Sequence, residues 1–364
     1  MPKVSLYASV GPELTHYDVD VAHAGLIRRD TVSLPANVQY VWPHASRRFL
    51  YAATSDSASG MGAAGNTHHV TALRIDPATG ALAPHGTPIP LPTRPIHMAT
   101  DIPSRFILVA FNNPSALRVY RVNDDGTPGA EVAQPGPVDA GIFAHQVRAT
   151  PDNRQVILVA RGHDAADGKP EEPGALKVFD FTDGVLSNVQ TVAPNGGLGF
   201  GPRHLDFHPS KPWVYVSLER QNALDVFDLA NGVVSPAPRF RKNALGTAPV
   251  TRQAVGTVHV HPNGRAVYVA NRAATADGEN SLAVYTIDQA TGEPHLIEHM
   301  DTRGVHPRTF HIDPSGRLMA VAHITGAVLS LFHIGADGGL HFAHSYDIDV
   351  GNRTMWWMGM VEHG

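Results

Sequence analysis

Arginines, histidines and one glutamate give this 364-residue chain the side chains needed to bind an anion and to move a proton. The arginines of interest are Arg161, Arg203, Arg272 and Arg308. A guanidinium group binds a planar carboxylate or a phosphate through parallel hydrogen bonds. Glu219 and His145 could each take up or release a proton beside a bound substrate. Together these residues predict a pocket for a small anion with an acid–base group beside it, provided that the fold brings them together.

A repeat organises the elements that must position these residues. Each copy is a short strand that ends at a proline, a polar turn and a second apolar strand, as in "HLDFHPSKPWVYVSLE" and "FHIDPSGRLMAVAH". The prolines lie 48 to 60 residues apart and are Pro43, Pro103, Pro151, Pro209, Pro262 and Pro314. In most copies a third strand and an Asp/Asn/Gly turn into a fourth strand follow. This pattern predicts the four-stranded antiparallel blade of a β-propeller.

Six copies are complete, and the two ends of the chain supply strands for a seventh. These are "TMWWMGMVEH" at the C-terminus and "KVSLYASV" with "LTHYDVDVA" at the N-terminus. Closing a ring with strands from both termini removes an exposed sheet edge. We therefore expect an all-β, seven-bladed β-propeller that forms one domain over residues 1–364, with six or eight blades as alternatives.

The repeat places the candidate residues in two rings. The start of the first strand holds Asn37, His97, His145, Arg203, Gly256 and Arg308, and the end of the second strand holds Ser55, Asn112, Arg161, Glu219, Arg272 and Ile324. In an antiparallel hairpin these two positions lie at the same end, so we expect both rings around one mouth of the central channel. Three insertions, 55–69, 161–174 and 272–281, leave from the second ring and are expected to form a rim there. The alternatives are solvated loop charges and insertions without a function.

Composition excludes several classes of protein. Without cysteine the chain has no disulfide, thiolate metal site or cysteine nucleophile, and a net charge of −5 gives no support for nucleic-acid binding. The N-terminal "MPKVSLYASV" lacks a secretion signal and no long apolar run predicts a membrane span. We therefore expect a cytoplasmic protein, either a monomer or a weak homo-oligomer, without a cofactor.

Two further motifs have a structural interpretation beside a functional one. His259 and His261 lie two apart on a strand, a spacing that can bind a metal. However, His208 has the repeat position of His261, which favours a structural role and no metal site. Trp356 and Trp357 should alternate, with one facing the channel and one packing between blades.

The segment "GPRHLDFHPSKPWVYVSLERQNALDVFDL" (201–229) resembles the 6-phosphogluconolactonase-like lactonase propellers. The segments 144–160 and 306–323 are similar to blades of that family, and the resemblance extends from Lys3 to "MWWMGMV". It implies an enzyme that hydrolyses a small anionic sugar-acid lactone. Because the family includes carboxy-cis,cis-muconate lactonizing enzymes, the reverse, lactone-forming reaction of a cycloisomerase stays open. A non-catalytic propeller that binds a partner is the other alternative.

The resemblance also implies that His145, Arg203, Glu219 and Arg272 are catalytic, and all four belong to the two rings. We expect Glu219 to activate water, the two arginines to hold the anionic group or the oxyanion, and His145 to donate a proton. The residues expected to line the substrate pocket are His97, His204, Arg161, Asn112, Arg308 and Trp356.

Overall fold

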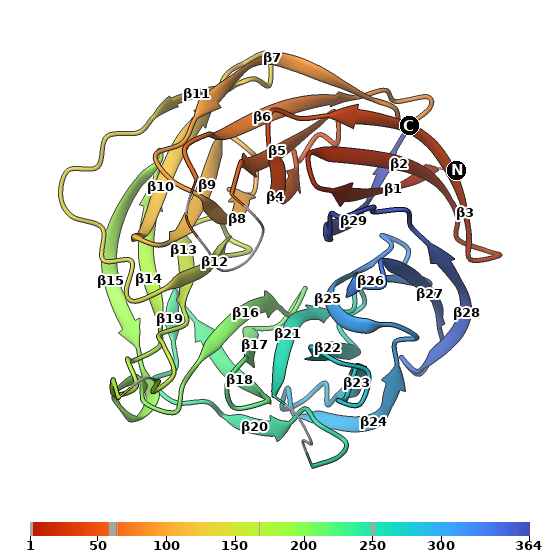
Figure 1. The fold of residues 1–364 in the computed structure, drawn as a ribbon. Coiled ribbons are helices and arrows are strands. Elements are labelled where there is room, and N and C mark those ends of the chain that lie inside the picture. The colour runs from red at the N-terminus through yellow and green to blue at the C-terminus, as the bar shows by residue number, and fades with distance from the viewer. Residues whose placement is uncertain (1–2, 58–62, 64, 167, 249–251) are drawn as a thin grey trace.

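Seven antiparallel sheets stand around a central axis in the computed structural model, which describes residues 3–57, 63, 65–166, 168–248 and 252–364 (Figure 1). Each sheet is one blade with four strands in its main path, and the seven-bladed propeller expected from the repeat is confirmed. The first strand of each blade faces the axis. These inner strands are β4 (Asn37–Pro43), β8 (Pro95–Thr100), β12 (Ala144–Ala149), β16 (Pro202–Phe207), β21 (Gln253–Val260), β25 (Val305–Ile312) and β29 (Met355–His363).

The other strands follow outward in the order of the sequence. The second strands are β5 (Phe49–Ser55), β9 (Phe106–Asn112), β13 (Gln155–Ala160), β17 (Trp213–Leu218), β22 (Ala266–Ala273), β26 (Leu318–Thr325) and β1 (Lys3–Val10). The third strands are β6 (His68–Ile75), β10 (Ser115–Val122), β14 (Ala175–Thr182), β18 (Ala223–Ala230), β23 (Ser281–Ile287), β27 (Val328–Ile334) and β2 (Glu13–Asp20). The outer strands are β7 (Leu82–Pro90), β11 (Pro128–Glu131), β15 (Val185–Val192), β20 (Phe240–Asn243), β24 (Pro294–Asp301), β28 (Leu340–Asp347) and β3 (Gly25–Ser33). A short strand β19 (Val233–Val234) also pairs with β18, and a 3-10 turn spans η1 (Pro194–Gly197).

The second strands are apolar on both faces because each face meets a different neighbouring blade. In β13, Val156 and Leu158 pack toward the preceding blade, whereas Ile157 and Val159 pack toward the next one. The described residues form seven such apolar clusters, one between each pair of adjacent blades. The continuous apolar runs seen in the sequence are therefore strands buried on two sides rather than strands with one wet face.

Polar contacts repeat between blades. The hydroxyl groups of four second-strand tyrosines donate to a carbonyl in the outer hairpin of the next blade, at 2.6 to 3.0 Å: Tyr7 to Gly80, Tyr51 to Gly126, Tyr215 to Gly292 and Tyr268 to Gly338. The same kind of contact explains two histidines of the repeat. His208 Nε2 donates to the Gly264 carbonyl at 2.9 Å, and His261 Nε2 donates to the Gly316 carbonyl at 2.8 Å. These two histidines connect the turns of adjacent blades, which is the structural role expected from their position.

The ring closes through strands from both termini, as the sequence indicated. β29 pairs with β1, and β3 completes this blade. The Ser5 hydroxyl lies 2.8 Å from Nε2 of both His16 and His363. Because His363 Nδ1 faces the Pro77 carbonyl at 3.2 Å and must donate to it, its Nε2 accepts the Ser5 proton. Ser5 in turn accepts from His16, so one chain of hydrogen bonds joins β2, β1, β29 and the neighbouring blade.

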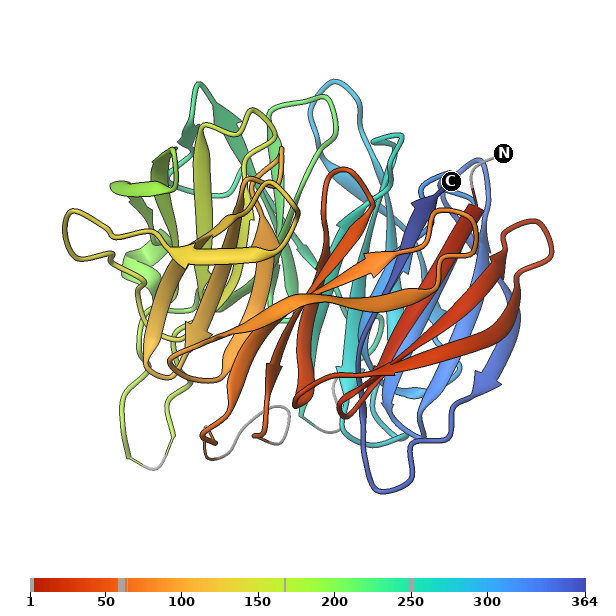
Figure 2. The same cartoon turned by 90° about the horizontal axis from the view of Figure 1, so that it is seen from above.

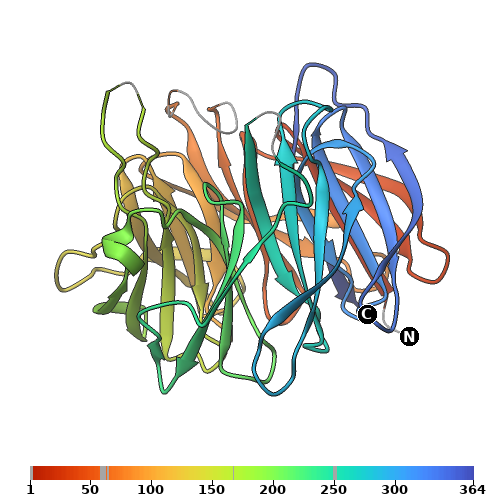
Figure 3. The ribbon, with the colours of Figure 1, turned by 90° about the horizontal axis from the view of Figure 1, so that it is seen from below.

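The two ends of the propeller differ. Figures 2 and 3 show the chain termini at one end and the connections from β5, β13 and β22 to their third strands at the other. These connections are the predicted insertions, of which 58–62, 64 and 167 lie outside the described residues. No helix in the described part of the chain is long and apolar enough to span a membrane.

Candidate active site

Each inner strand has a β-bulge at its pairing with the second strand. In β12 the residue His145 has no partner between the pairs Ala144–Ala160 and Gln146–Val159. Arg203 is the extra residue of β16, and Arg308 is the extra residue of β25. A bulge opposes two residues to one, so two consecutive side chains can face the same side of the sheet. Here that side is the channel.

The bulges surround a narrow hollow, which we call the mouth hollow. Consecutive pairs line it: Gln39 and Tyr40, Arg203 and His204, Arg308 and Thr309, and Trp356 and Trp357, together with Ile96, His145 and Thr257. The expected alternation of the two tryptophans is wrong in part. Both line the hollow because the β29 bulge sets Trp356 and Trp357 against one residue of β1, although Trp357 also packs in an apolar cluster.

Glu219 lies among three arginines from three blades. Its Oε2 accepts from Arg161 Nη1 at 2.6 Å, and its Oε1 lies 3.2 Å from Arg203 Nε and also contacts Arg272 Nη2. We call these four residues the Glu219 cluster. Its backbone is fixed as well, because the Glu219 N–H donates to the Gly201 carbonyl at 2.8 Å. Arg203, whose side chain is only 2% exposed, joins the cluster to the mouth hollow.

Positive charge exceeds negative charge at this place. Burial would raise the pKa of Glu219, but Arg272, Arg203 and Arg161 hold it far below the usual value, so the carboxylate stays ionised and is a weak base in this state. Burial, followed by the charge of Arg272, lowers the pKa of Arg203 to about 9. Arg308 has no ion pair among the described residues and stacks on Trp356, with its Cζ 3.4 Å from the ring centroid. Three guanidinium groups thus share the carboxylate of Glu219, and a fourth has no carboxylate partner in the described part of the chain.

Several buried polar atoms near this excess charge have no hydrogen-bond partner among the described residues. They include Arg203 Nη1, His145 Nδ1 and Trp356 Nε1. Each unpaired buried polar group lowers the stability of the folded protein by about 1 to 3 kcal/mol. A cluster of such groups therefore needs an explanation, and a site where a ligand supplies the missing hydrogen bonds is one. The arrangement can hold an anion or the oxygen of a polarised carbonyl.

The histidines at the mouth hollow, His145 and His204, and the adjacent His97 are neutral. Burial first, and then Arg203 or Arg148, holds the pKa values of His145, His204 and His97 well below the usual value. The rings of His145 and His204 have centroids 5.3 Å apart, and those of His97 and His204 are 6.0 Å apart. Each ring therefore offers one N–H and one lone pair at neutral pH.

The structure brings together most of the predicted site residues, but not all of them. Five of them line the mouth hollow: His145, Arg203, His204, Arg308 and Trp356. Arg161, Glu219 and Arg272 belong to the adjoining Glu219 cluster. His97 does not line the hollow. It is 1% exposed, its Nδ1 lies 3.5 Å from the Val147 N–H, and the lining residue of that blade is Ile96, because the bulge occurs one residue earlier than in β12.

Asn112 is also separate from the site. It is the last residue of β9 and is 5% exposed. It does not line the mouth hollow, and within the described part of the chain no hydrogen bond or ion pair joins it to the Glu219 cluster. Asn37 of the first predicted ring is replaced in the lining by Gln39, where the bulge of β4 lies. Sequence reasoning missed Tyr40, Phe143 and His306. The ring of Phe143 lies against Arg161, with Cζ 4.5 Å from its centroid, and His306 Nε2 lies 3.3 Å from Arg272 Nη1.

The 161–174 insertion is tied to the neighbouring blade beside the site. Arg220, whose side chain is 4% exposed, pairs with Asp164 at 3.4 Å and with Glu171 at 3.0 Å. It also donates to the carbonyl groups of His163 and Phe200. These contacts fix the described part of this connection at the mouth, as expected for a rim.

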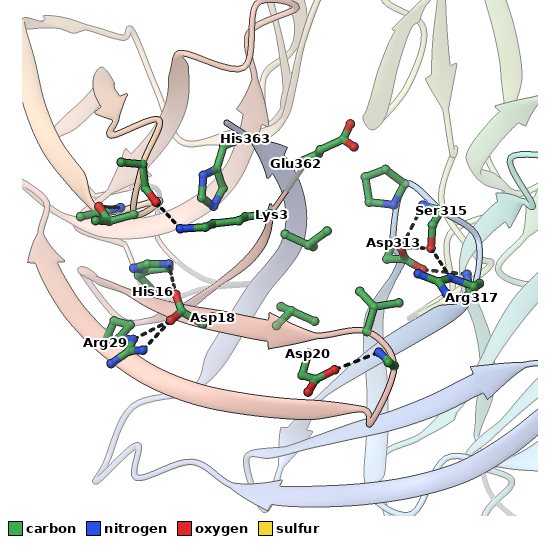
Figure 4. A pocket seen from close by; sticks show the side chains of 18 of the residues that line it. Lys3, His16, Asp18, Asp20, Arg29, Asp313, Ser315, Arg317, Glu362 and His363 are labelled. Atoms are coloured by element: carbon green, nitrogen blue, oxygen red, sulfur yellow. Dashed lines mark hydrogen bonds and ion pairs between the residues drawn. The ribbon is translucent and has the colours of Figure 1, made fainter. Parts of the chain in front are cut away.

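A wider hollow lies at the other end of the molecule, with a cavity volume of about 1000 Å³ against about 10 Å³ for the mouth hollow. Figure 4 shows Lys3, His16 and His363 on one side of it and the turn with Ser315 and Arg317 on the other. Two of its acids already have partners: Asp18 pairs with Arg29 at 2.6 Å, and Asp313 accepts from Ser315 and from backbone N–H groups. Size alone therefore favours this hollow, whereas the convergent unpaired groups favour the mouth hollow.

Comparison with known proteins places the chain in a family. The family model described as a lactonase with a seven-bladed β-propeller matches residues 4–357. The chain belongs to this lactonase family. A relative, the 6-phosphogluconolactonase of Bacillus subtilis (strain 168), is 29% identical over 343 residues, which cover 89% of this chain and 88% of that protein. The 6-phosphogluconolactonase of Cronobacter sakazakii is 28% identical over 333 residues, with the same coverage of both proteins.

The fold of this lactonase-family chain also matches solved structures. The periplasmic gluconolactonase of Pseudomonas aeruginosa superimposes with a TM-score of 0.79 over the whole of both chains, at 20% sequence identity. At that identity the likeness shows the fold alone. The family assignment and the fold agree, and both match the resemblance seen in the segment 201–229.

Proposed function

We propose that this lactonase-family chain hydrolyses the ring ester of an anionic sugar-acid lactone, with 6-phosphogluconolactone as the first substrate to test. The observation that carries the proposal is the charge balance at the mouth, where Arg161, Arg203 and Arg272 contact the carboxylate of Glu219 and Arg308 stacks on Trp356 without an ion pair among the described residues. A negatively charged lactone would supply the missing negative charge. Relatives that are named 6-phosphogluconolactonase support the same substrate class.

In this proposal the arginines do two tasks. One guanidinium group binds the anionic substituent of the substrate, for which Arg308 is suited because no carboxylate occupies it. Arg203 then faces the lactone carbonyl with its unpartnered Nη1 and stabilises the oxyanion that forms when water attacks. Removing a single donor of this kind from an enzyme lowers kcat by about 100- to 1000-fold.

The proton transfers fall to Glu219 and His145. Glu219 is a weak base while three arginines contact it, so its role as base requires that the substrate draw one of them away, which raises its pKa. Water would then lose a proton to Glu219 as its oxygen bonds to the carbonyl carbon. The ring C–O bond breaks as His145 donates its N–H proton to the departing ring oxygen, and the proton held by Glu219 then passes to His145, so both groups return to their starting states. The product is the open hydroxy acid.

The test follows ring opening of freshly made lactones against the spontaneous rate. The set contains 6-phosphogluconolactone, gluconolactone and muconolactone, and Glu219→Gln and Arg203→Gln serve as the active-site variants. We expect acceleration of the sugar lactones that both variants lose. Acceleration of none of them would refute hydrolysis, and conversion of a muconate into its lactone would assign the reverse reaction instead.

A further inference from the structure

Two residues just before inner-strand bulges have a backbone conformation that their side chains disfavour. Phe143 has φ 56° and His306 has φ 61°. Each lies two residues before the extra residue of a bulge, His145 in one blade and Arg308 in the other. A left-handed conformation is uncommon outside glycine and is a clear outlier for a bulky residue such as phenylalanine. Such a conformation costs about 1 to 3 kcal/mol and persists where surrounding contacts require it.

The side chain of Phe143 contacts an arginine of the Glu219 cluster. The Arg161 guanidinium lies over the phenyl ring, 4.5 Å from the ring centroid, while its Nη1 donates to Glu219. The Arg161 backbone N–H also donates to the Phe143 carbonyl at 2.9 Å. The left-handed turn at Phe143 therefore fixes both the backbone and the guanidinium plane of Arg161. A guanidinium on an aromatic face keeps its in-plane donors free for an anion.

His306 does the same for Arg272 by a different contact. Arg272 Nη1 lies 3.3 Å from His306 Nε2, and an arginine can only donate, so this nitrogen is the acceptor. Burial and the charge of Arg272 lower the pKa of His306 to about 3, which keeps the acceptor available. The His306 N–H donates to Asn280 Oδ1 at 2.8 Å, and the same oxygen accepts from the Ala273 N–H at 3.1 Å. Asn280 thus connects the His306 backbone to the end of the strand that carries Arg272.

We propose that Phe143 and His306 are positioning residues that aim Arg161 and Arg272 at the place where the substrate anion or oxyanion binds. The proposal rests on the hydrolytic function above for its kinetic consequences, but not for its structural ones. Arg203 needs no such support, because it is the extra residue of a bulge and is 1% exposed. Arg161 directly follows the second strand β13, and Arg272 is the next-to-last residue of the second strand β22, so both lie at strand ends, where long side chains have more freedom.

The test compares variants that remove each contact with variants that keep it. Phe143→Leu and His306→Leu retain apolar bulk but lose the aromatic face and the acceptor. Phe143→Tyr keeps the face, and the Oε1 atom of His306→Gln can accept in place of Nε2. We expect each Leu variant to lose about tenfold in kcat/KM, the equivalent of one hydrogen bond or cation–π contact. The Tyr and Gln variants should stay within about threefold of the wild type. Equal activity of the Leu variant and its conservative partner would overturn the proposal.

Crystal structures of the two Leu variants supply a readout that does not depend on turnover. We expect the guanidinium of Arg161 or Arg272 to leave Glu219 in the respective variant, and the affinity for 6-phosphogluconate, measured by calorimetry, to fall. If both arginines keep their contacts with Glu219, positioning is refuted whatever the kinetics show. If the wild type hydrolyses no lactone while the arginines move as expected, the proposed function fails and the positioning role stands.

Discussion

Removing the charge of Glu219 should lower the free energy of unfolding, and anions that bind in its place should restore it. Glu219→Gln keeps the shape of the side chain but leaves the guanidinium groups of Arg161, Arg203 and Arg272 without their carboxylate. Removing one partner of a buried ion pair costs about 3 to 5 kcal/mol. We take the lower limit, about 3 kcal/mol, because the Glu219 side chain is 12% exposed and glutamine still accepts hydrogen bonds. The three ion pairs are the reason for this cost.

This free energy can be measured as a shift in melting temperature. An unfolding entropy of about 2.1 cal/mol/K per residue gives about 0.8 kcal/mol/K for 364 residues, so 3 kcal/mol corresponds to about 4 °C. Thermal unfolding at low ionic strength should show this drop. A phosphate or citrate concentration near 100 times Kd should restore about 2.7 kcal/mol to the variant, and less to the wild type, where Glu219 competes for the arginines.

A matched control uses the same substitution at an exposed ion pair. Glu131 accepts from Arg118 at 2.6 Å, with both side chains about two-fifths exposed, so Glu131→Gln should cost less than about 1 kcal/mol. If Glu219→Gln melts with the control, or if anions stabilise the wild type and the variant equally, the Glu219 cluster is not the centre of uncompensated charge described above.

Three further outcomes are expected. Tyr215→Phe should lower the free energy of unfolding by about 1 to 2 kcal/mol, because it leaves the Gly292 carbonyl unpaired, whereas Tyr120→Phe, whose buried hydroxyl has no partner, should cost nothing in the same urea titration. Arg308→Gln should reduce kcat/KM at least tenfold more for a phosphorylated lactone than for the unphosphorylated one, and an equal loss for both would exclude Arg308 as the anion-binding residue. The free energy of unfolding should be greatest above the usual histidine pKa of 6.5 and should fall as the pH drops below it, because the unfolded chain takes up protons that five buried imidazoles cannot. With five groups the fall is at most about 7 kcal/mol per pH unit. Urea midpoints that agree at pH 7.5 and pH 5.5 would contradict this. Those imidazoles belong to His97, His145, His204, His306 and His311.

The blade architecture could be predicted because its signals are local. A proline-anchored turn, an apolar second strand and an Asp/Asn/Gly hairpin each leave a mark in the sequence. Glu219, Arg161 and Arg272 could be placed together for the same reason, since each lies within one residue of the end of a second strand, at a constant distance from the turn.

The bulges could not be predicted, and they decide which inner-strand residues line the site. None of the extra residues His145, Arg203 and Arg308 is a glycine, and counting six residues back from the proline reaches them only because each bulge lies at that distance. In β8 the extra residue lies one position earlier, so the count gives the buried His97 instead of Ile96. The contacts of Phe143 and His306 depend on backbone dihedral angles that have no signature in residue type.

Ring closure has a consequence for how the protein is made. β1 to β3 leave the ribosome before the other strands of the propeller, yet β29, their inner partner, follows all of those strands in the sequence. Until then β1 presents an unpaired edge, which invites pairing with other chains. The same strand carries Trp356, on which Arg308 stacks. A nascent or truncated chain that ends before Met355 therefore lacks both a closed ring and a complete site. Closure of the ring and completion of the site thus depend on the same strand.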